Sequence, residues 1–431
     1  MSNKSKLRYH GVTRASIILA LFVLGFVAPD VYDLSSHLSK AGAIISQIAG
    51  AYFAETVTPE ELQQTYDDEN RLLRVLVVPG HSNESWGTEF RGVKEAEVNL
   101  ELGEHLYRYL KSDASFDAMI TRAGDGEHTP WFANYLTDNE LSIRAYMVQK
   151  RAEFTIAEAQ GHIKRHTQVS HNEAPSQTAL ELYGINKYAS ENGVDIVIHI
   201  HFNDYPGRKH GIAGKHSGFS MYVPEDTLPN ARASRELALS LRDRLSRHFA
   251  TSDLPLEEGV VIPDQELIAV GSNASQRRAA ILIEYGYIYE NQFHDRALRG
   301  PILEELALQT YWGILDHFEK GSAMNQSRLG VLLPYFWDDS AIDMEASSRS
   351  VLSLQGALSS EGLYPPPGKS RNDCPISGTF GPCTKESLAL FQERFAEMLL
   401  VPEGLARGSG TLGPKTKSIL NELYGDPESL L

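Results

Sequence analysis

The chain has 431 residues, of which 42% are hydrophobic and two are cysteines, and its formal net charge at pH 7 is -16. The length and the apolar content are sufficient for two globular domains. The negative charge excludes binding to nucleic acid or to an anionic surface through charge alone, so binding to an anionic partner must rest on specific contacts.

The first segment of the chain has the pattern of an export signal. Four basic residues between Lys4 and Arg14 precede the apolar run 15–28. This order predicts a signal peptide or a membrane anchor over residues 1–30, with a buried core helix as the alternative. The run is shorter than the roughly 20 residues of a membrane-spanning helix, which favours a signal peptide, but no convincing cleavage site follows closely, which favours an uncleaved anchor. A helical, acidic spacer is expected over 31–71.

Three short apolar runs predict buried strands of an α/β sheet. They are 74–78 (RVLVV), 195–201 (DIVIHIH) and 279–284 (AAILIE), and each is β-branched and ends in a polar, Gly or Pro segment. Open α/β folds bind their ligands at the carboxyl edge of the sheet. A single histidine at a strand end is more often structural, but His81, His201 and Glu284 together favour a site at this edge.

Glu95 lies at the start of a predicted amphipathic helix. Val98, Leu102 and Leu106 recur at helical spacing and mark its buried side. Glu95 extends that side, whereas Glu97 falls on the solvent side. A buried carboxylate is costly unless a cation relieves it. The alternative is an acidic residue that is favoured at a helix N-terminus by the helix dipole.

Two imidazoles and one carboxylate are the ligand type of catalytic zinc, which keeps a fourth position open for water. We therefore expect His81, Glu95 and His201 to bind one Zn²⁺ per chain. Glu284 would then accept a proton from water and return a proton to a leaving amine. This arrangement predicts amide hydrolysis.

Two further segments of the same region are candidates for controlling or contacting the substrate. The stretch 127–181 is long and polar, and we expect a lid or regulatory helix over the site, with a solvated helix face as the alternative. The basic loop 208–216 (RKHGIAGKH) follows His201. It is expected either to meet substrate carboxylates or to be a solvated loop.

A repeated pattern lies near the C-terminus. The copies 377–388 (SGTFGPCTKESL) and 409–420 (SGTLGPKTKSIL) each place a glycine turn before a Pro at a predicted first helical position. With a third helix over 351–358, they predict a small three-helix domain over 345–425, after a linker over 321–344. Cys374 and Cys383 lie in this domain and form either a disulfide, in an oxidising compartment, or two buried thiols.

The segments VVPGHSN, GVKEAEVNL, ITRAGD, VDIVIHIHFND and AAILIEYGYIYEN resemble the zinc-dependent N-acetylmuramoyl-L-alanine amidases of the type-3 family. The resemblance implies a catalytic domain over 72–320 with a mostly parallel or mixed central sheet flanked by helices. It implies that His81, Glu95 and His201 bind zinc and that Glu284 is catalytic. The bond that it implies joins N-acetylmuramic acid to the L-alanine of the stem peptide of peptidoglycan.

The chain departs from the family pattern at three places, of which Tyr287 in place of a usual phenylalanine is the mildest. Ser82 and Asn83 replace a usual pair of glycines, and His199 replaces a usual serine. Because side chains alternate along a strand, His199 and His201 point to the same face, and His199 is the rival for the ligand role. His201 is preferred because it matches the His-x-Asn of the family. Arg122 matches a further family segment for which we expect a structural role.

The C-terminal segments LQGALSSEGLYPP, SGTFGPCTKESLALFQ and SGTLGPKTKSIL resemble the peptidoglycan-binding domain of cell-wall hydrolases. The N-terminal pattern predicts export to the periplasm or cell envelope, with the protein either free or anchored at the cytoplasmic membrane. The two resemblances imply that the protein is tethered to its substrate. The implied partners are peptidoglycan and a regulatory activator protein, not nucleic acid. The alternatives are another zinc-dependent cell-wall peptidase and a non-catalytic wall-binding scaffold with a decayed amidase domain.

Overall fold

The computed structural model describes residues 57–164, 174–205, 207–209, 211–272, 274–319 and 330–425. The segment 1–30, predicted as a signal peptide or anchor, and most of the predicted spacer lie outside these residues. Within the described ranges, no helix combines the length and the apolar character that crossing a membrane requires.

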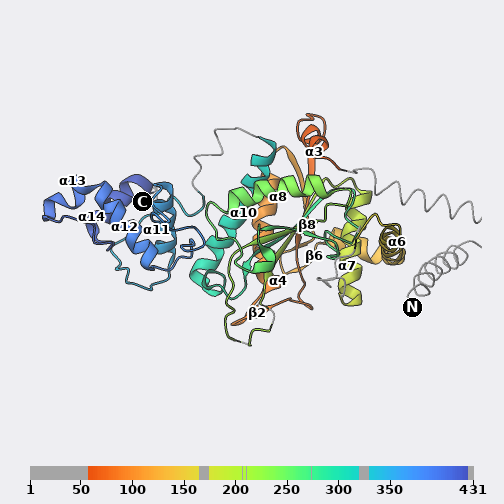
Figure 1. The fold of residues 1–431 in the computed structure, drawn as a ribbon, viewed down its shortest axis with the longest axis horizontal. Coiled ribbons are helices and arrows are strands. Elements are labelled where there is room, and N and C mark those ends of the chain that lie inside the picture. Colours follow the sequence, from red (N-terminus) through yellow and green to blue (C-terminus); the bar gives the residue numbers. More distant parts are fainter. Residues whose placement is uncertain are drawn as a thin grey trace, which may run out of the picture.

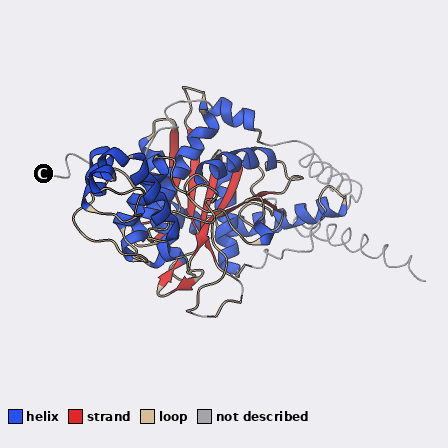
Figure 2. Cartoon of the chain, turned by 60° about the vertical axis from the view of Figure 1, so that its left-hand side comes forward, coloured by secondary structure: helices blue, strands red, loops and turns tan. Residues whose placement is uncertain are grey.

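A six-stranded mixed sheet forms the centre of the larger unit (Figure 2). The strand order is β4 (Phe116–Ile120), β1 (Leu73–Pro79), β7 (Ile196–Asn203), β10 (Ala279–Tyr287), β8 (Ser220–Pro224) and β9 (Val261–Asp264). The first four strands are parallel, β8 is antiparallel to β10, and β9 is parallel to β8. The predicted α/β class and the three predicted strands are confirmed.

Helices cover both faces of the sheet, which is why β1 is apolar on both sides. One face packs against α4 (Glu95–Ser112), α8 (Ala231–Leu245) and α10 (Arg296–Phe318) in a core that includes Val75 and Val77 (Figure 1). The other face packs Leu76 and Val78 against α5 (Pro130–Asp138) and α7 (Ser176–Glu191). As the helical spacing predicts, Val98, Leu102 and Leu106 of α4 are completely buried.

Within the stretch 127–181, the described part builds a layer of this unit. It contains β6 (Glu127–His128), which pairs with β5 (Arg122–Ala123), then α5, α6 (Glu140–Ala159) and the start of α7. Phe132 and Ile143 are 1% and 0% exposed and pack toward α7. Burial of these side chains is enough to explain why the helices form. It does not test whether the stretch acts as a lid, which stays a prediction.

Two shorter parts complete the larger unit. The hairpin β2 (Glu89–Phe90) and β3 (Val93–Lys94) precedes α4, while η1 (Pro255–Glu257) and α9 (Asn291–His294) follow β8 and β10. Helix α3 (Pro59–Tyr66) lies in the predicted spacer, yet Leu62 is 3% exposed and the ring of Tyr66 stacks on Phe318 at 4.6 Å. This part of the spacer therefore packs on the core, because α3 has apolar residues on one side.

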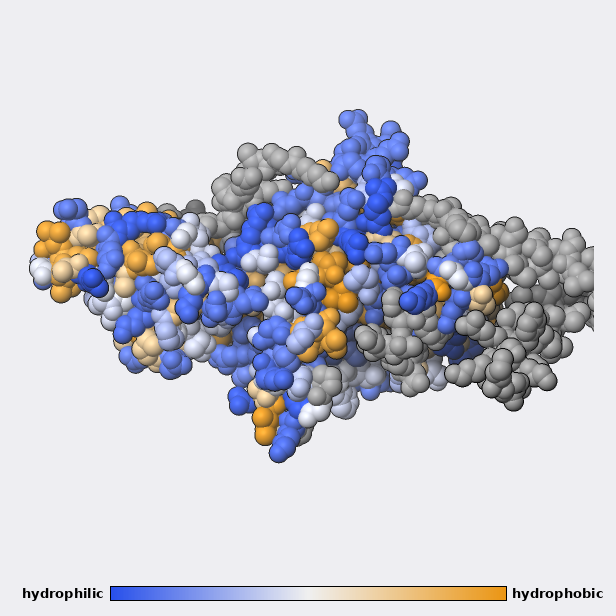
Figure 3. Space-filling model, viewed as in Figure 1, coloured by the Kyte–Doolittle hydropathy of each residue, from blue (hydrophilic) through white to orange (hydrophobic). Residues whose placement is uncertain are grey.

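The C-terminal unit contains the three predicted helices, α11 (Arg349–Ser360), α12 (Pro382–Arg394) and α14 (Pro414–Tyr424), drawn in blue in Figure 1. The short α13 (Ala396–Leu399) and η3 (Val401–Glu403) connect the last two. Pro382 and Pro414 open their helices as expected, and Cys374 and Cys383 form a disulfide. In Figure 3, apolar side chains gather at the outer end of this unit, near α13, with hydrophilic side chains beside them.

The described part of the predicted linker is packed rather than free. Leu332, Leu333 and Trp337 are 3%, 5% and 2% exposed, and the Trp337 indole donates to the Ser350 carbonyl at 3.0 Å. Residues 331–337 are largely apolar, and burying apolar side chains is favourable, so this part of the predicted linker packs against the rest of the protein.

In each copy of the repeat, the turn is hydrogen-bonded to the side chain of a buried glutamine. The Gln355 amide donates to the Thr379 carbonyl and the Thr384 hydroxyl, and Gln392 donates in the same way to Thr411 and Thr416. The carbonyl oxygen of each glutamine accepts from the glycine of its SGT turn at 2.9 Å. The repeat in sequence is therefore a repeat of one hydrogen-bonded turn.

Replacing Gln392 by Leu should lower the free energy of unfolding by about 3 kcal/mol, because buried backbone groups of the second turn would lose their partners. Urea denaturation of the full-length chain measures this. Glu386→Leu on the exposed side of the same helix is the matched control and should change stability by no more than about 0.5 kcal/mol. Equal stabilities of the two variants would contradict the assigned role of Gln392.

Candidate metal centre

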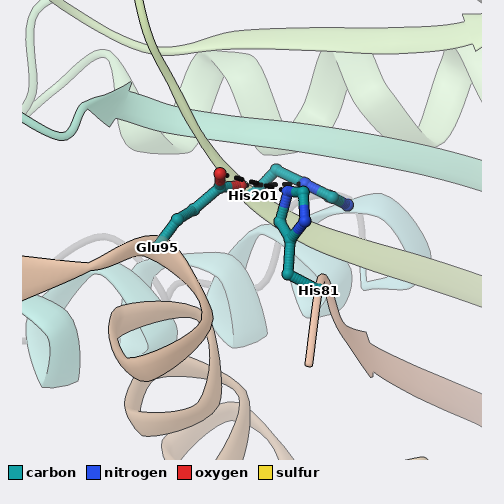
Figure 4. A group of neighbouring side chains, drawn as sticks. All are labelled: His81, Glu95 and His201. Atoms are coloured by element: carbon teal, nitrogen blue, oxygen red, sulfur yellow. Dashed lines mark hydrogen bonds and ion pairs between the residues drawn. The ribbon is translucent and has the colours of Figure 1, made fainter. Parts of the chain in front are cut away.

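His81, Glu95 and His201 meet at the carboxyl edge of the sheet (Figure 4). Their potential ligand atoms all lie within 4.8 Å of one another. The His81 Nε2 atom lies 3.1 Å from Glu95 Oε2, and the His201 Nδ1 atom lies 3.1 Å from Glu95 Oε1. Each carboxylate oxygen therefore faces one imidazole.

The three side chains are brought together by the order of the strands and by the backbone at His81, Gly80 and Gly87. Strands β1 and β7 are parallel neighbours, so His81, just after β1, and His201, near the end of β7, reach the same edge. His81 has a φ of 64°, a left-handed conformation that non-glycine residues rarely adopt. A Cβ atom on Gly80 would lie 2.3 Å from the His201 ring, and one on Gly87 would lie 2.3 Å from Glu95 Oε2. Only glycine leaves room for the three ligands at these positions.

Glu95 is 4% exposed and accepts several hydrogen bonds. The Thr88 amide donates to Oε2 at 3.0 Å, and the Phe202 amide and the Asn99 side chain donate to Oε1 at 3.3 and 3.4 Å. Burial by itself raises the pKa of Glu95, but the hydrogen bonds with His201 and His81 outweigh it and hold that pKa well below the usual range. Glu95 is thus a buried carboxylate that stays ionised.

The donor set fits a divalent metal ion of the zinc type. Two imidazole nitrogens and one carboxylate oxygen converge, and catalytic zinc sites use such three-ligand sets. Among the described residues, this is the one group of three or more His, Cys, Asp or Glu side chains with such spacing. The glycines at 80 and 87 leave the space that the ligands occupy.

His199 lies outside this group. It is 0% exposed, and both of its ring nitrogens are buried without a hydrogen-bond partner. Burial, with smaller effects from His201 and Arg278, lowers the pKa of His199 to about 3, so the ring is neutral. The structure therefore brings His201, not its rival, to the carboxylate of Glu95.

Glu284 stands beside the group on the next strand. It is the register partner of His201 in the parallel pair of β7 and β10. Its Oε2 atom is buried and has no hydrogen-bond partner. Burial, and then the charges of Glu95 and Glu257, raise the pKa of Glu284 well above its ordinary value. This side chain can hold a proton at a pH where most carboxylates cannot.

Two residues that support the site were not predicted from the sequence. Glu257 is 1% exposed and accepts from the Asn203 amide at 2.9 Å and the Tyr222 hydroxyl at 2.8 Å. It follows no periodic pattern, so no sequence signal could single it out. Asn99 lies four residues after Glu95 on the buried side of α4 and donates to the Gly80 carbonyl at 3.1 Å. Helical spacing alone could have identified it.

Arg122 and Asn83, which the sequence also singled out, form hydrogen bonds with the loops around His81 and Gly126. Arg122 is 2% exposed and donates to the carbonyls of Gly80 and Gly126 at 3.0 and 2.9 Å, which supports the expected structural role. Asn83, one of the departures from the family pattern, donates to Glu127 Oε1 at 2.7 Å. Asn83 thus ties the loop after His81 to the start of the stretch 127–181.

Residues 75–315 match the model of the family described as N-acetylmuramoyl-L-alanine amidase. The solved CwlD amidase of Clostridioides difficile, in complex with the GerS lipoprotein, is similar at 15% identity over 57% of this chain and 99% of its own, with a TM-score of 0.38. An amidase of Mycobacterium smegmatis is similar at 14% identity over 57% of this chain and 97% of its own, with a TM-score of 0.35. Comparison with curated proteins gives no match.

Replacing His199 by Leu should leave metal binding intact, whereas His201→Leu should abolish it, because of these two histidines only His201 faces Glu95. Metal content after dialysis against zinc measures this difference. Loss of the metal in the His199 variant, with retention in the His201 variant, would reverse the assignment.

The same His199→Leu change should alter the pH dependence of stability. In the wild type, His199 stays neutral when folded down to about pH 3, while the unfolded chain protonates it near its ordinary pKa of 6.5. This histidine therefore costs stability as the pH falls below 6.5, by about 1.4 kcal/mol per pH unit. Urea denaturation at several pH values should show the variant gaining on the wild type below pH 6.5 and not above it.

Proposed function

The chain belongs to the N-acetylmuramoyl-L-alanine amidase family, and on this premise we propose that it is a zinc-dependent peptidoglycan hydrolase. The bond cleaved joins N-acetylmuramic acid to the L-alanine of the stem peptide. The observation that carries the proposal is the convergence of His81, Glu95 and His201 within 4.8 Å, with Glu284 on the adjacent strand.

His81, Glu95 and His201 would hold one zinc ion. When bound, zinc supplies Lewis-acid chemistry, polarising the scissile carbonyl and making water a stronger acid. The chain contributes the geometry: the Thr88 and Phe202 amides and the Asn99 side chain fix the carboxylate of Glu95. Its two oxygens then face the ring nitrogens of His81 and His201 that would bind the metal with it. Hydrogen bonds from residues outside the ligand set orient a ligating carboxylate in this way.

Glu284 is the proposed proton carrier of the reaction. As a carboxylate it accepts a proton from the attacking water, and as a carboxylic acid it donates that proton to the nitrogen of the departing L-alanine. Its raised pKa suits the second step, since a more basic carboxylate keeps the proton until the amine takes it. Burial of Oε2 without another partner keeps this oxygen available for the transfer.

The C-terminal unit, over 345–425, is proposed to bind peptidoglycan, and the unit over 72–320 to be catalytic. Tethering to the polymer would raise the local substrate concentration.

We further propose export to the periplasm or cell envelope, with residues 1–30 as a signal peptide or membrane anchor. A regulatory protein is the proposed second partner. The disulfide between Cys374 and Cys383 supports an oxidising compartment.

Replacing Glu284 by Gln should lower kcat on peptidoglycan by about 10²–10⁴-fold while the zinc content stays unchanged, because only the proton transfer is lost. Release of dye-labelled fragments from cell walls measures the rate. Glu97→Gln, on the exposed side of α4, is the matched control and should retain activity. Chelation of zinc should inactivate the wild type, and added zinc should restore it.

The products decide between the proposal and its alternatives. A free lactyl carboxylate on the glycan and a new N-terminal alanine support amidase activity. New termini within the stem peptide would identify another zinc peptidase instead. A chain that binds cell walls but neither binds zinc nor cleaves would be a scaffold.

A further inference from the structure

A pocket of about 590 Å³ opens beside the metal centre, and nothing so far assigns an occupant to it. It is lined by Gly87, Thr88, Glu89, Asp204, Tyr205, Gly207 and Arg208. Two of these residues also touch the centre: the Thr88 amide donates to Glu95 Oε2, and Gly87 leaves no room for a Cβ against His81 and Glu95. A group bound in the pocket would therefore lie next to the reacting bond.

Arg208 connects the two walls of the pocket, which are the loop after β7 and the hairpin before α4. Its guanidinium pairs with Asp204, donates to the Glu89 carbonyl at 2.6 Å and lies 5.4 Å from the ring of Phe90. Asp204 also accepts from the Thr88 hydroxyl at 2.6 Å. The loop after β7 and the hairpin before α4 are thus cross-linked, so the pocket is formed in advance of binding.

These contacts change what the basic loop can recognise. The Arg208 side chain is 8% exposed and its charge is matched by Asp204, so it is not available as an anchor for a substrate carboxylate. Glu89 and Asp204 leave the lining with more carboxylates than cations. Such a lining repels carboxylates and accepts hydrogen bonds from hydroxyl and amide donors.

Trp86 adds an aromatic surface next to this polar lining. It directly precedes Gly87 and is 41% exposed, whereas Trp312 and Trp337 are 4% and 2% exposed in the core. The Trp86 carbonyl accepts from the Ala96 amide at 3.0 Å, and the Lys94 ammonium lies 4.6 Å from its ring centroid. The hydrogen bond fixes the backbone of Trp86 directly before Gly87 of the pocket, and much of the Trp86 side chain stays exposed although Lys94 lies near its ring.

We propose that this pocket, with Trp86 as its aromatic platform, binds the pyranose ring of the substrate. A pyranose has an apolar C–H face that packs on an aromatic ring and a rim of hydroxyl and acetamido groups that hydrogen-bond to carboxylates. The aromatic ring of Trp86 and the carboxylates of the pocket provide partners for both parts of the sugar. They lie next to Thr88, whose amide donates to Glu95. The inference rests on the proposed amidase function, because it places the muramoyl sugar, and not the peptide, in this pocket.

The test compares two probes that differ only in the sugar. One is N-acetylmuramoyl-L-alanyl-D-isoglutamine, and the other is lactoyl-L-alanyl-D-isoglutamine, which keeps the scissile amide but has no pyranose. Calorimetry uses the zinc-loaded full-length chain with Glu284→Gln, so that neither probe is consumed. Trp86→Ala should weaken binding of the sugar probe about tenfold and leave the lactoyl probe unchanged, while Trp86→Phe should retain most of the affinity.

Phe336→Ala is the matched control, since Phe336 is a similarly exposed aromatic residue, at 37%, in the C-terminal part of the chain. It should bind both probes as the Glu284→Gln parent does. Equal effects of Trp86→Ala on the two probes, no effect on either, or failure of the parent chain to bind the sugar probe would overturn the subsite. The amidase function is read separately: if the chain with Glu284 intact does not cleave the sugar probe, although Trp86→Ala still weakens its binding, the function fails and the subsite stands.

Discussion

The structure around the site depends on one constraint, the burial of the ionised Glu95 carboxylate between two imidazoles. A buried charge without partners is strongly destabilising, so every element that meets here must supply a donor or make room. Strands β1 and β7 bring His81 and His201, the helix α4 begins at Glu95, and the Thr88 and Phe202 amides complete the shell. Glycines occupy the two positions where any Cβ would displace a ligand.

The two carboxylates of the site are driven in opposite directions by their surroundings. Hydrogen bonds with two histidines lower the pKa of Glu95, whereas burial, Glu95 and Glu257 raise the pKa of Glu284, whose Oε2 has no partner. Environments that separate two pKa values in this way commonly mark a division of labour between an electrostatic and a proton-transferring group. This contrast supports the proposed roles of ligand for Glu95 and proton carrier for Glu284.

The C-terminal unit is in direct contact with the larger unit. Asn372 exchanges hydrogen bonds with Thr251 at 3.0 to 3.2 Å, and Gly378 lies so close to Leu298 of α10 that a Cβ would approach it to 2.5 Å. The apolar residues around Leu332 and Trp337 join the same core. If the C-terminal unit binds peptidoglycan as proposed, these contacts orient the polymer relative to the group of His81, Glu95 and His201, in addition to keeping it near.

Periodicity in the sequence by itself determined which residues face inward and where elements begin or end. It predicted the three buried strands, the inward Glu95, the prolines that open α12 and α14, and the edge of the sheet at which the site lies. Only the tertiary structure separated His201 from His199, because both lie on one face of β7 and only His201 comes within reach of Glu95. It also decided the burial of Glu257, the pairing of Arg208 with Asp204 and the packing of 331–337. The physical reason is that spacing along a chain reports the direction of a side chain within its own element, whereas distances between elements depend on sheet register and loop contacts that residues far apart in sequence establish together.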